Sequence, residues 1–391
     1  MKDFIYNTPT KVFFGKKKEE ELGAILKSYN IRKVLLHYGT KSIKASGLYD
    51  TVIDQLNKAN IAFVELGGVS PNPKLSLALE GVKIAKENDV DLILAVGGGS
   101  VIDSAKLIAV GAKVDFNPWL FSIKEKTPTD HIPVGVILTL SAAGSDMSNS
   151  CVITNEETKE KRGFNCEENR PLFAILNPEL TYTVSKYQTG CGIVDVMMHT
   201  LERFFSEGEP TPVTDNVALG ILKAVVDCGK TAINDPTNYE ARATLMWANS
   251  LSHNGLTSCG REFVMSVHQI EHEVSGMFDE VAHGAGLSVL WPAWAKLACN
   301  VMPERFQLFA NQVMGIAKTN DPLKDGLDGV EAVKKFFKEI GMPTSMKELN
   351  IDENNFEALA NNYTFNGKRV LKDLITVDYN KALEILKLTN E

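Results

Sequence analysis

Short apolar runs and amphipathic stretches alternate through the first half of the chain. Short apolar runs are typical of buried strands, and apolar positions three and four residues apart are typical of helices. The pattern predicts strands at residues 4–6, 11–15, 33–38, 61–66, 91–96, 134–140 and 173–176. It predicts helices at residues 17–29, 49–57, 75–87 and from residue 101 onward. Strand and helix follow one another with short connections, which favours right-handed crossovers and a parallel sheet.

From about residue 185 onward the pattern changes to helical periodicity with few strand signals. Helices are expected, among others, at residues 218–226, 239–251, 306–317 and 330–340. A linker that contains proline and tyrosine, residues 177–187, separates the two halves. We therefore predict an α/β domain at residues 1–184 and an all-helical domain at residues 185–391.

Length and charge narrow the classes of function. A chain of 391 residues exceeds what one ordinary core supports, so two domains are expected on length as well. The net charge is −8 and no block of basic residues occurs, which argues against a nucleic-acid partner. The six cysteines are widely spread without a Cys-x-x-Cys pair, as expected for free thiols in a reducing compartment. The polar N-terminus and the lack of an apolar run of ~18 residues argue against a signal peptide and a membrane span, so we expect a cytoplasmic protein.

A run of glycines links one predicted strand to the helix that follows it. Strand 91–96 leads into Gly97, Gly98, Gly99 and Ser100, and the helix begins directly afterwards. Glycines at a helix N-terminus let backbone N–H groups approach a phosphate closely, and the helix dipole adds to the attraction. The alternative is a tight turn that binds nothing, and the spacing is not that of the G-x-G-x-x-G fingerprint. Small residues at 141–145, after strand 134–140, leave room for a ligand at the carboxyl edge of the sheet.

Four residues in the second half have the composition of a ligand set for one metal ion. Asp195 and His199 are spaced i, i+4 in a helical pattern, so a carboxylate and an imidazole lie on one face, one turn apart. His268 begins a second i, i+4 pair with His272, and His283 follows. One oxygen and three imidazole nitrogens suit Fe(II), Zn(II), Co(II) or Mn(II) better than Mg²⁺ or Ca²⁺.

The alternative is that these histidines are unrelated core or capping residues. Two i, i+4 pairs and a histidine followed by glycine, all in apolar surroundings, favour the metal site instead. Gly284 and Gly286 are expected to turn the backbone before the apolar run at residues 287–291.

These motifs carry a family resemblance along essentially the whole chain. The chain resembles the iron-containing (group III) alcohol dehydrogenases in its motifs Gly97-Gly98-Gly99-Ser100-x-x-Asp103, Gly192-x-x-Asp195-x-x-x-His199 and His268-x-x-x-His272 with His283-Gly284. It is most similar to the branch of NADP-dependent butanol dehydrogenases and broad aldehyde reductases. Residues 38–50, 270–273 and 291–294 carry that likeness. The chain departs from this branch at Thr40, Lys41 and Asp146.

The resemblance implies a fold, a reaction and a set of site residues. The fold is a Rossmann-like α/β cofactor domain followed by an all-helical metal-binding domain, as in dehydroquinate synthase. The reaction interconverts a primary alcohol and its aldehyde with NADP(H) and one divalent metal, Fe(II) or alternatively Zn(II), in a homodimer. The implied cofactor-binding residues are Gly39, Ser42, Asn72, Gly97, Gly98, Gly99, Ser100, Asp103, Thr139 and Lys161. The implied metal ligands are Asp195, His199, His268 and His283.

Two residues are expected to act on the reacting groups. Asp103 is placed by the resemblance near the nicotinamide amide. His272, one turn from His268, is expected to pass the alcohol proton to solvent, and the alternative is a packed histidine beside the ligands.

The turn after strand 33–38 predicts the choice of cofactor. Enzymes that prefer NAD commonly place an acidic side chain near the ribose 2′-hydroxyl. The turn Gly39-Thr40-Lys41-Ser42-Ile43-Lys44 has no Asp or Glu, and Lys41 or Lys44 could pair with a 2′-phosphate. We therefore predict a preference for NADP(H), and the alternative is a solvated turn whose lysines contact nothing.

Three other functions stay open. They are an NAD-dependent polyol dehydrogenase of the glycerol type, a carbon–oxygen lyase that shares the fold, and a metal-storing or structural protein. The lyase should carry several basic residues for its substrate, and residues 195–283 are not rich in lysine or arginine.

Overall fold

The chain divides into two units in the computed structural model, which describes residues 1–390. One unit is Asn7–Val184, and the other runs from Ser185 onward and includes Met1–Tyr6. The prediction assigned residues 1–184 to the first domain, but the six N-terminal residues group with the second unit. The backbone N–H of Lys2 donates to the carbonyl of Gly260 at 2.9 Å. Residues 4–6 form no strand, so that prediction was wrong.

The first unit is built on a six-stranded sheet in the order β1-β8-β5-β4-β2-β3, in which all pairs are parallel. The sequence prediction of a parallel sheet is therefore confirmed. The strands are β1 (Lys11–Phe14), β2 (Lys33–Gly39), β3 (Ala62–Val69), β4 (Leu92–Gly97), β5 (Val134–Leu138) and β8 (Phe173–Leu176). The helices are α1 (Leu22–Ser28), α2 (Ser42–Ala45), α3 (Leu48–Ala59), α4 (Leu75–Glu87), α5 (Gly99–Gly111) and α6 (Trp119–Ser122), with short 3-10 helices η1 (Lys18–Glu21), η2 (Glu167–Asn169) and η3 (Pro178–Thr181).

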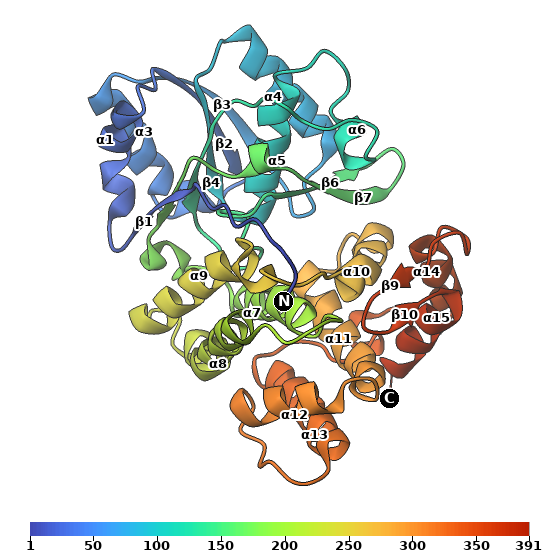
Figure 1. Cartoon of the computed structure of the whole chain (residues 1–391). Coiled ribbons are helices and arrows are strands. Elements are labelled where there is room, and N and C mark those ends of the chain that lie inside the picture. Colours follow the sequence, from blue (N-terminus) through green and yellow to red (C-terminus); the bar gives the residue numbers. More distant parts are fainter. Residues whose placement is uncertain (391) are drawn as a thin grey trace. The chain divides into compact units, whose positions relative to one another are not determined.

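Helices cover both faces of this sheet (Figure 1). On one face Val34 and Leu36 of β2 pack with Leu26 of α1 and Val52 of α3. On the other face the fully buried His37 of β2 contacts the Ser104 hydroxyl of α5 through Nε2 at 2.9 Å, and its Nδ1 contacts the Leu66 carbonyl at 2.8 Å. Burial lowers the pKa of His37 to about 4. Successive residues of β2 thus face opposite layers, as the period of a strand requires.

An antiparallel hairpin that the sequence pattern did not predict lies between β5 and β8 in the chain. It consists of β6 (Ser150–Asn155) and β7 (Glu160–Asn165) and forms a sheet of its own. Strand β7 reads Glu-Lys-Arg-Gly-Phe-Asn, so it lacks the apolar alternation that marks a half-buried strand.

The second unit is helical apart from a hairpin of two short strands, β9 (Leu371–Lys372) and β10 (Thr376–Val377). Its helices are α7 (Lys186–Phe204), α8 (Pro212–Asn234), α9 (Tyr239–His253), α10 (Ser266–Met277), α11 (His283–Cys299), α12 (Pro303–Gln312), α13 (Pro322–Glu339), α14 (Phe356–Tyr363) and α15 (Tyr379–Leu388), with η4 (Leu256–Ser258), η5 (Lys347–Leu349) and η6 (Glu353–Asn355). The predicted helix 306–317 ends earlier, because α12 stops at Gln312.

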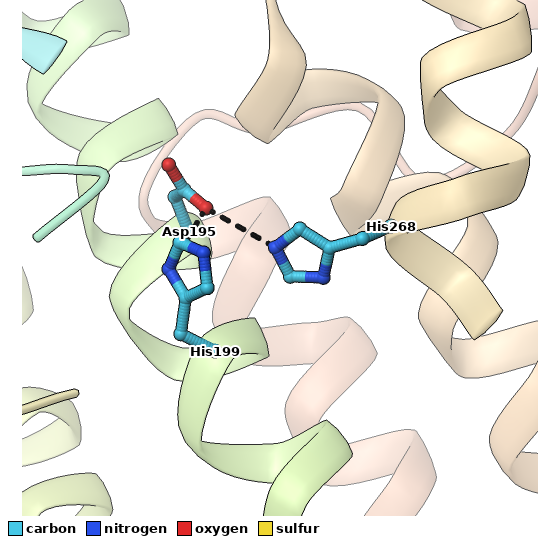
Figure 2. Close-up of side chains that lie close together, drawn as sticks. All are labelled: Asp195, His199 and His268. Atoms are coloured by element: carbon cyan, nitrogen blue, oxygen red, sulfur yellow. Dashed lines mark ion pairs between the residues drawn. The ribbon is translucent and has the colours of Figure 1, made fainter. Parts of the chain in front are cut away.

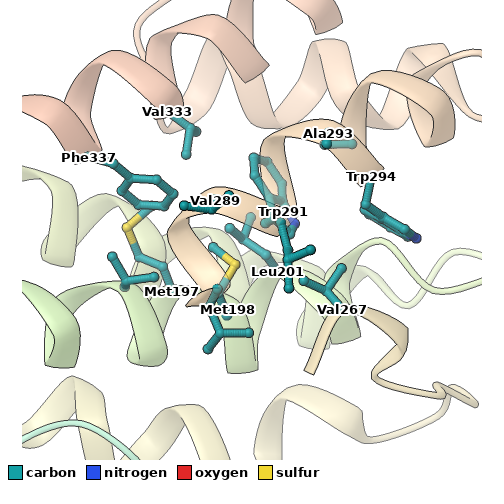
Figure 3. Close-up of a cluster of buried hydrophobic side chains, with 14 of the residues drawn as sticks. Met197, Met198, Leu201, Val267, Val289, Trp291, Ala293, Trp294, Val333 and Phe337 are labelled. Atoms are coloured by element: carbon teal, nitrogen blue, oxygen red, sulfur yellow. The ribbon is translucent and has the colours of Figure 1, made fainter. Parts of the chain in front are cut away.

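Helix α7 is the centre of this unit. Its residues from Thr189 to Phe204 are all buried, as expected for a helix surrounded by others. Figure 3 shows Met197, Met198 and Leu201 of α7 packed with side chains of α10, α11 and α13, including Trp291 and Phe337. The Ser185 hydroxyl starts the helix by accepting a hydrogen bond from the Gln188 N–H at 3.2 Å. A rigid, fully packed helix therefore carries two of the predicted metal ligands.

Candidate metal centre and cofactor-binding loops

The four predicted metal ligands come together in the second unit. Oxygen Oδ1 of Asp195 lies 3.3 Å from Nδ1 of His199, 3.5 Å from Nε2 of His268 and 3.9 Å from Nε2 of His283. Asp195 and His199 come from α7, His268 comes from α10, and His283 is the first residue of α11. Figure 2 shows Asp195 and His199 on one helix with the His268 ring directed toward them from another. We call these four residues the ligand cluster.

The donor atoms of the ligand cluster fit one divalent transition metal. Within residues 1–390, Asp195 Oδ1, His199 Nδ1 and His268 Nε2 are buried and make no hydrogen bond. A buried polar atom without a partner costs about 1–3 kcal/mol, so three such atoms at one point indicate a missing common partner. Two atoms that bind one metal at about 2.1 Å with tetrahedral geometry lie about 3.4 Å apart. The separations of 3.3 and 3.5 Å match that value.

A buried glutamate that sequence reasoning missed holds His268 in place. The Glu202 carboxylate accepts hydrogen bonds from the backbone N–H of Val267 at 2.8 Å and of His268 at 3.3 Å. It also pairs with Nδ1 of the His268 ring. With the proton on Nδ1, Nε2 of His268 presents its lone pair toward Asp195. Glu202 lies seven residues after Asp195, on the same face of α7, and that spacing is the signal that could have found it.

A second buried glutamate holds His283 in the same way. Glu271, fully buried on α10, pairs through Oε2 with Nδ1 of the His283 ring, so Nε2 points toward Asp195. Glu271 lies three residues after His268, between two histidines of the sequence, and that position could have indicated a carboxylate beside the metal ligands. Both imidazoles therefore have the carboxylate partner that metal-bound histidines commonly use.

Gly284 and Gly286 do not turn the chain, as the sequence suggested, but lie in the first turn of α11. A Cβ atom at Gly284 would lie 2.2 Å from the carbonyl oxygen of Cys191 in α7. A Cβ atom at Gly286 would lie 2.8 Å from Cγ of Glu271. The glycines thus allow α11 to pack closely enough on α7 and α10 for His283 to reach the other three residues of the ligand cluster.

The two innermost histidines differ in protonation. Burial lowers the pKa of His199 far below its usual value, and the adjacent His253 ring, 4.0 Å away between centroids, lowers it further. Burial also lowers the pKa of His268, but the Glu202 and Asp195 carboxylates outweigh this effect and raise it to about 9. A cation must therefore displace a proton from His268, while His199 is already neutral.

His272, the predicted proton carrier, lies beside the ligand cluster. Its ring centroid is 5.5 Å from that of His283, and Glu271, His272 and His283 form a second group of potential ligand atoms. Since Nδ1 of His283 already pairs with Glu271, we interpret this group as the surroundings of the ligand cluster. The role of His272 stays a prediction.

The predicted glycine loop lies at the carboxyl end of β4 and opens α5 in the first unit. Gly97 is the last residue of β4, and Gly99 and Ser100 form the first turn of α5. A Cβ atom at Gly98 would lie 3.1 Å from Cβ of Leu140, and one at Gly99 would lie 2.9 Å from Cβ of Ala143. The glycines therefore let the segment after β5 approach the helix start.

This helix start fits a phosphate group. The N-cap residue of α5 is Gly98, which has no side chain that could cap the helix. The first N–H groups of a helix have no partner within the helix, and they attract an anion. A nicotinamide dinucleotide would present its pyrophosphate to these groups.

Four of the other predicted cofactor residues lie at or just after the carboxyl ends of strands of the six-stranded sheet, and Lys161 lies on the separate β6-β7 hairpin. Gly39 ends β2, and Ser42 begins α2 and is exposed. Thr139 follows β5 and donates its backbone N–H to the Gly97 carbonyl at 3.0 Å. Asn72, with φ of 53°, lies in the loop before α4, and Lys161 is buried on β7. The carboxyl edge of a parallel sheet is where such folds bind ligands.

Asp103 already has partners inside the protein. Its Oδ1 accepts a hydrogen bond from the Ser145 hydroxyl, and its Oδ2 accepts one from the Val152 N–H at 3.0 Å. Burial raises the pKa of Asp103, and the nearby Lys106 and Lys161 ammonium groups oppose this rise. The predicted contact with a nicotinamide amide stays a prediction.

Similarity to known families covers both units. The family described as iron-containing alcohol dehydrogenase matches residues 9–178, and the C-terminal part of the Fe-containing alcohol dehydrogenase family matches residues 189–387. The chain is 40% identical over 388 residues to NADH-dependent butanol dehydrogenase A of Clostridium acetobutylicum, with 99% of each chain covered. It is 32% identical over 393 residues to the NADPH-dependent aldehyde reductase YqhD of Escherichia coli, with 98% of this chain and 99% of that protein covered.

Solved structures show the same likeness. The crystal structure of NADH-dependent butanol dehydrogenase A from Thermotoga maritima matches with a TM-score of 0.96 and 37% identity, over 100% of this chain and 99% of that chain. The structure of Escherichia coli YqhD matches with a TM-score of 0.94 and 29% identity, over 100% of this chain and 99% of that chain. Together with the ligand cluster and the glycine loop, these matches show that the chain belongs to the iron-containing alcohol dehydrogenase family, whose members are alcohol and aldehyde oxidoreductases that use a nicotinamide cofactor.

Proposed function

We propose that the protein interconverts a primary alcohol of the butanol class and its aldehyde by hydride transfer with NADP(H). Family membership supports the reaction class, and relatives named butanol dehydrogenase and aldehyde reductase support the substrate class. The observation that carries the proposal is the ligand cluster, because its three orphaned buried donor atoms fit a divalent cation.

In this proposal the residues of the helical unit prepare the substrate oxygen. A divalent ion, Fe(II) or Zn(II), supplies a Lewis acid there when it is bound by Asp195, His199, His268 and His283. Glu202 and Glu271 keep two of the imidazoles in the required tautomer. His272 passes the hydroxyl proton to solvent.

The sheet unit holds the cofactor in this proposal. The N–H groups at the start of α5 receive the pyrophosphate, and Gly98 and Gly99 allow its close approach. Asp103 accepts a hydrogen bond from the nicotinamide carboxamide. The reactive ring is thereby oriented by a carboxylate that Ser145 and the Val152 N–H hold in place.

The turn after β2 supports NADP(H). No acidic residue occurs between Gly39 and Ser46. The Lys44 ammonium lies over the rings of Tyr38 and Tyr49, at 5.2 and 4.8 Å from their centroids, so it is already engaged. The Lys41 side chain is exposed, and within residues 1–390 it has no ion-pair partner. Lys41 is therefore our candidate for the 2′-phosphate contact.

NADH is the second candidate cofactor, because butanol dehydrogenases 40% and 38% identical to this chain are named NADH-dependent. One measurement distinguishes NADPH from NADH as the preferred cofactor. Purified protein loaded with Fe(II) without oxygen should oxidise NADPH with butanal, and kcat/KM should be measured for NADPH and for NADH. A charge-assisted contact contributes roughly 1.5–3 kcal/mol, so we expect a preference of about tenfold or more for NADPH.

Gly39→Asp tests the reason for this preference. A Cβ atom at Gly39 would lie 3.6 Å from the Val69 carbonyl oxygen, an ordinary contact, so the variant should fold. The new carboxylate should repel a 2′-phosphate and reverse or erase the preference. Ala24→Asp adds the same charge at an exposed position of α1, outside the turn after β2, and should leave the preference unchanged. A parent ratio at or below one would refute the NADP(H) proposal, and absence of aldehyde reduction with either cofactor would refute the function.

Location and assembly complete the proposal. All six cysteines are free, as expected for a reducing compartment such as the cytoplasm. In the described chain no helix has both the length and the apolar character to cross a membrane. Strand β1 lies at the edge of the sheet, and edge strands can pair with another chain, which supports a homodimer that light scattering can test.

A further inference from the structure

A fully buried ammonium group lies on α5 in the sheet unit. Lys106 is 0% exposed. Its Nζ donates to the Ser145 hydroxyl at 2.8 Å, to the Ser148 hydroxyl at 3.2 Å, and to the carbonyls of Ser148 at 3.1 Å and Ser150 at 2.8 Å. A buried cation is costly unless it is hydrogen-bonded, and these four contacts satisfy the ammonium group.

One of these partners links Lys106 to Asp103. The Ser145 hydroxyl that accepts from Lys106 also donates to Oδ1 of Asp103. The ammonium itself lies 4.0 Å from the same Oδ1. The Val152 N–H fixes the other carboxylate oxygen at 3.0 Å. The carboxylate of Asp103 is thereby held in one orientation by groups from the segment after β5 and from β6.

The Ser148 hydroxyl provides a natural comparison. It accepts from Lys106 and from the Ser150 N–H at 3.3 Å, and it makes no direct contact with the Asp103 carboxylate. Ser145 and Ser148 are 3% and 1% exposed, so they are matched in burial, in chemistry and in contact with the same ammonium. They differ in whether they touch the Asp103 carboxylate.

We propose that Lys106 is a positioning residue for the cofactor: through Ser145 it fixes the Asp103 carboxylate as an oriented acceptor for the carboxamide N–H of a nicotinamide ring. This inference rests on the proposed function, in which Asp103 receives that carboxamide. Lys106 itself has no access to a ligand, because it is completely buried. Its effect reaches the cofactor only through Ser145 and Asp103.

The test compares two cofactor-like ligands in two serine variants. The dissociation constants of NADPH and of 2′-phospho-ADP-ribose, which lacks the nicotinamide ring, are measured by fluorescence titration and calorimetry. Ser145→Ala should weaken NADPH binding by about tenfold or more, because the Asp103 carboxylate is no longer held in the orientation that accepts the hydrogen bond from the carboxamide N–H. The same variant should bind 2′-phospho-ADP-ribose as the parent does. Ser148→Ala should keep both constants within about twofold of the parent.

Lys106→Met gives a second route to the same result. It removes the ammonium and keeps the length of the side chain, and it should also lose affinity for NADPH and not for the fragment. The proposal is overturned if Ser145→Ala and Ser148→Ala bind NADPH equally well, or if the loss extends equally to the fragment. Failure of the parent to bind either NADPH or NADH would instead refute the proposed function on which this inference rests.

Discussion

Glu202→Gln tests whether the ligand cluster depends on its outer carboxylates. The carboxylate accepts from two backbone N–H groups and from Nδ1 of His268. Glutamine has almost the same size, but its NH₂ group must face one of these donors, and its negative charge is gone. The His268 ring then loses the partner that directs Nε2 toward Asp195.

The expected losses of metal affinity and of stability follow from the contacts that Glu202 makes. Loss of an outer partner of a metal-bound histidine typically lowers metal affinity by about 10- to 100-fold, which equals about 1.4–2.8 kcal/mol. Since Glu202 also satisfies the first N–H groups of α10, we expect a further loss of stability of about 0.5–2 kcal/mol, as for a lost helix cap. Metal affinity should therefore fall at least tenfold, while binding of the nicotinamide cofactor should be unchanged.

The assay is competition with a chromophoric chelator for Co(II) and Zn(II), with metal content checked by mass spectrometry. Glu240→Gln, an exposed position in the first turn of α9, is the control for removing one negative charge. Calorimetric melting of the metal-free proteins shows whether the variant is folded. A dissociation constant within about twofold of the parent value, in a folded Glu202→Gln protein, would show that the cluster does not need this carboxylate.

Three further predictions concern packing, protonation and the histidines of α10. Gly284→Ala should lower the melting temperature and the metal affinity, because overpacking costs about 1–3 kcal/mol; Gly220→Ala, where a Cβ meets nothing within 4 Å, should not destabilise the protein. The pKa of His37 is depressed to about 4, so its NMR signals should not titrate between pH 8 and 5. The neutral His37 therefore contributes fully to stability above pH 6.5, and this contribution is lost as the pH falls through 4. Over that range the parent should lose up to about 3 kcal/mol more stability than His37→Gln does. Parallel curves of stability against pH for the two proteins would contradict this. His268→Ala should lose bound metal and keep cofactor binding, whereas His272→Ala should keep its metal and change the pH–rate profile; equal metal content in both variants, or an unchanged profile in the second, would refute these roles.

Local periodicity predicted much of the fold. Strand β8 and helix α4 have the bounds that were expected, and the strand, glycine loop and helix around Gly97 lie where the pattern placed them. These elements are decided by residues close in sequence, since burial of one face imposes a period of two or 3.6. The i, i+4 spacing likewise brought Asp195 and His199 onto one helix face.

Contacts between distant residues decided the rest. Residues 4–6 have the composition of a strand but form none, because a strand exists only where a neighbour pairs with it. Glu202 and Glu271 were missed, because their roles depend on α7, α10 and α11 meeting at one point, and no local pattern encodes that meeting. Gly284 was interpreted as a turn for the same reason. Its backbone is helical, and its lack of a Cβ matters only because α7, about ninety residues earlier in the chain, packs against it.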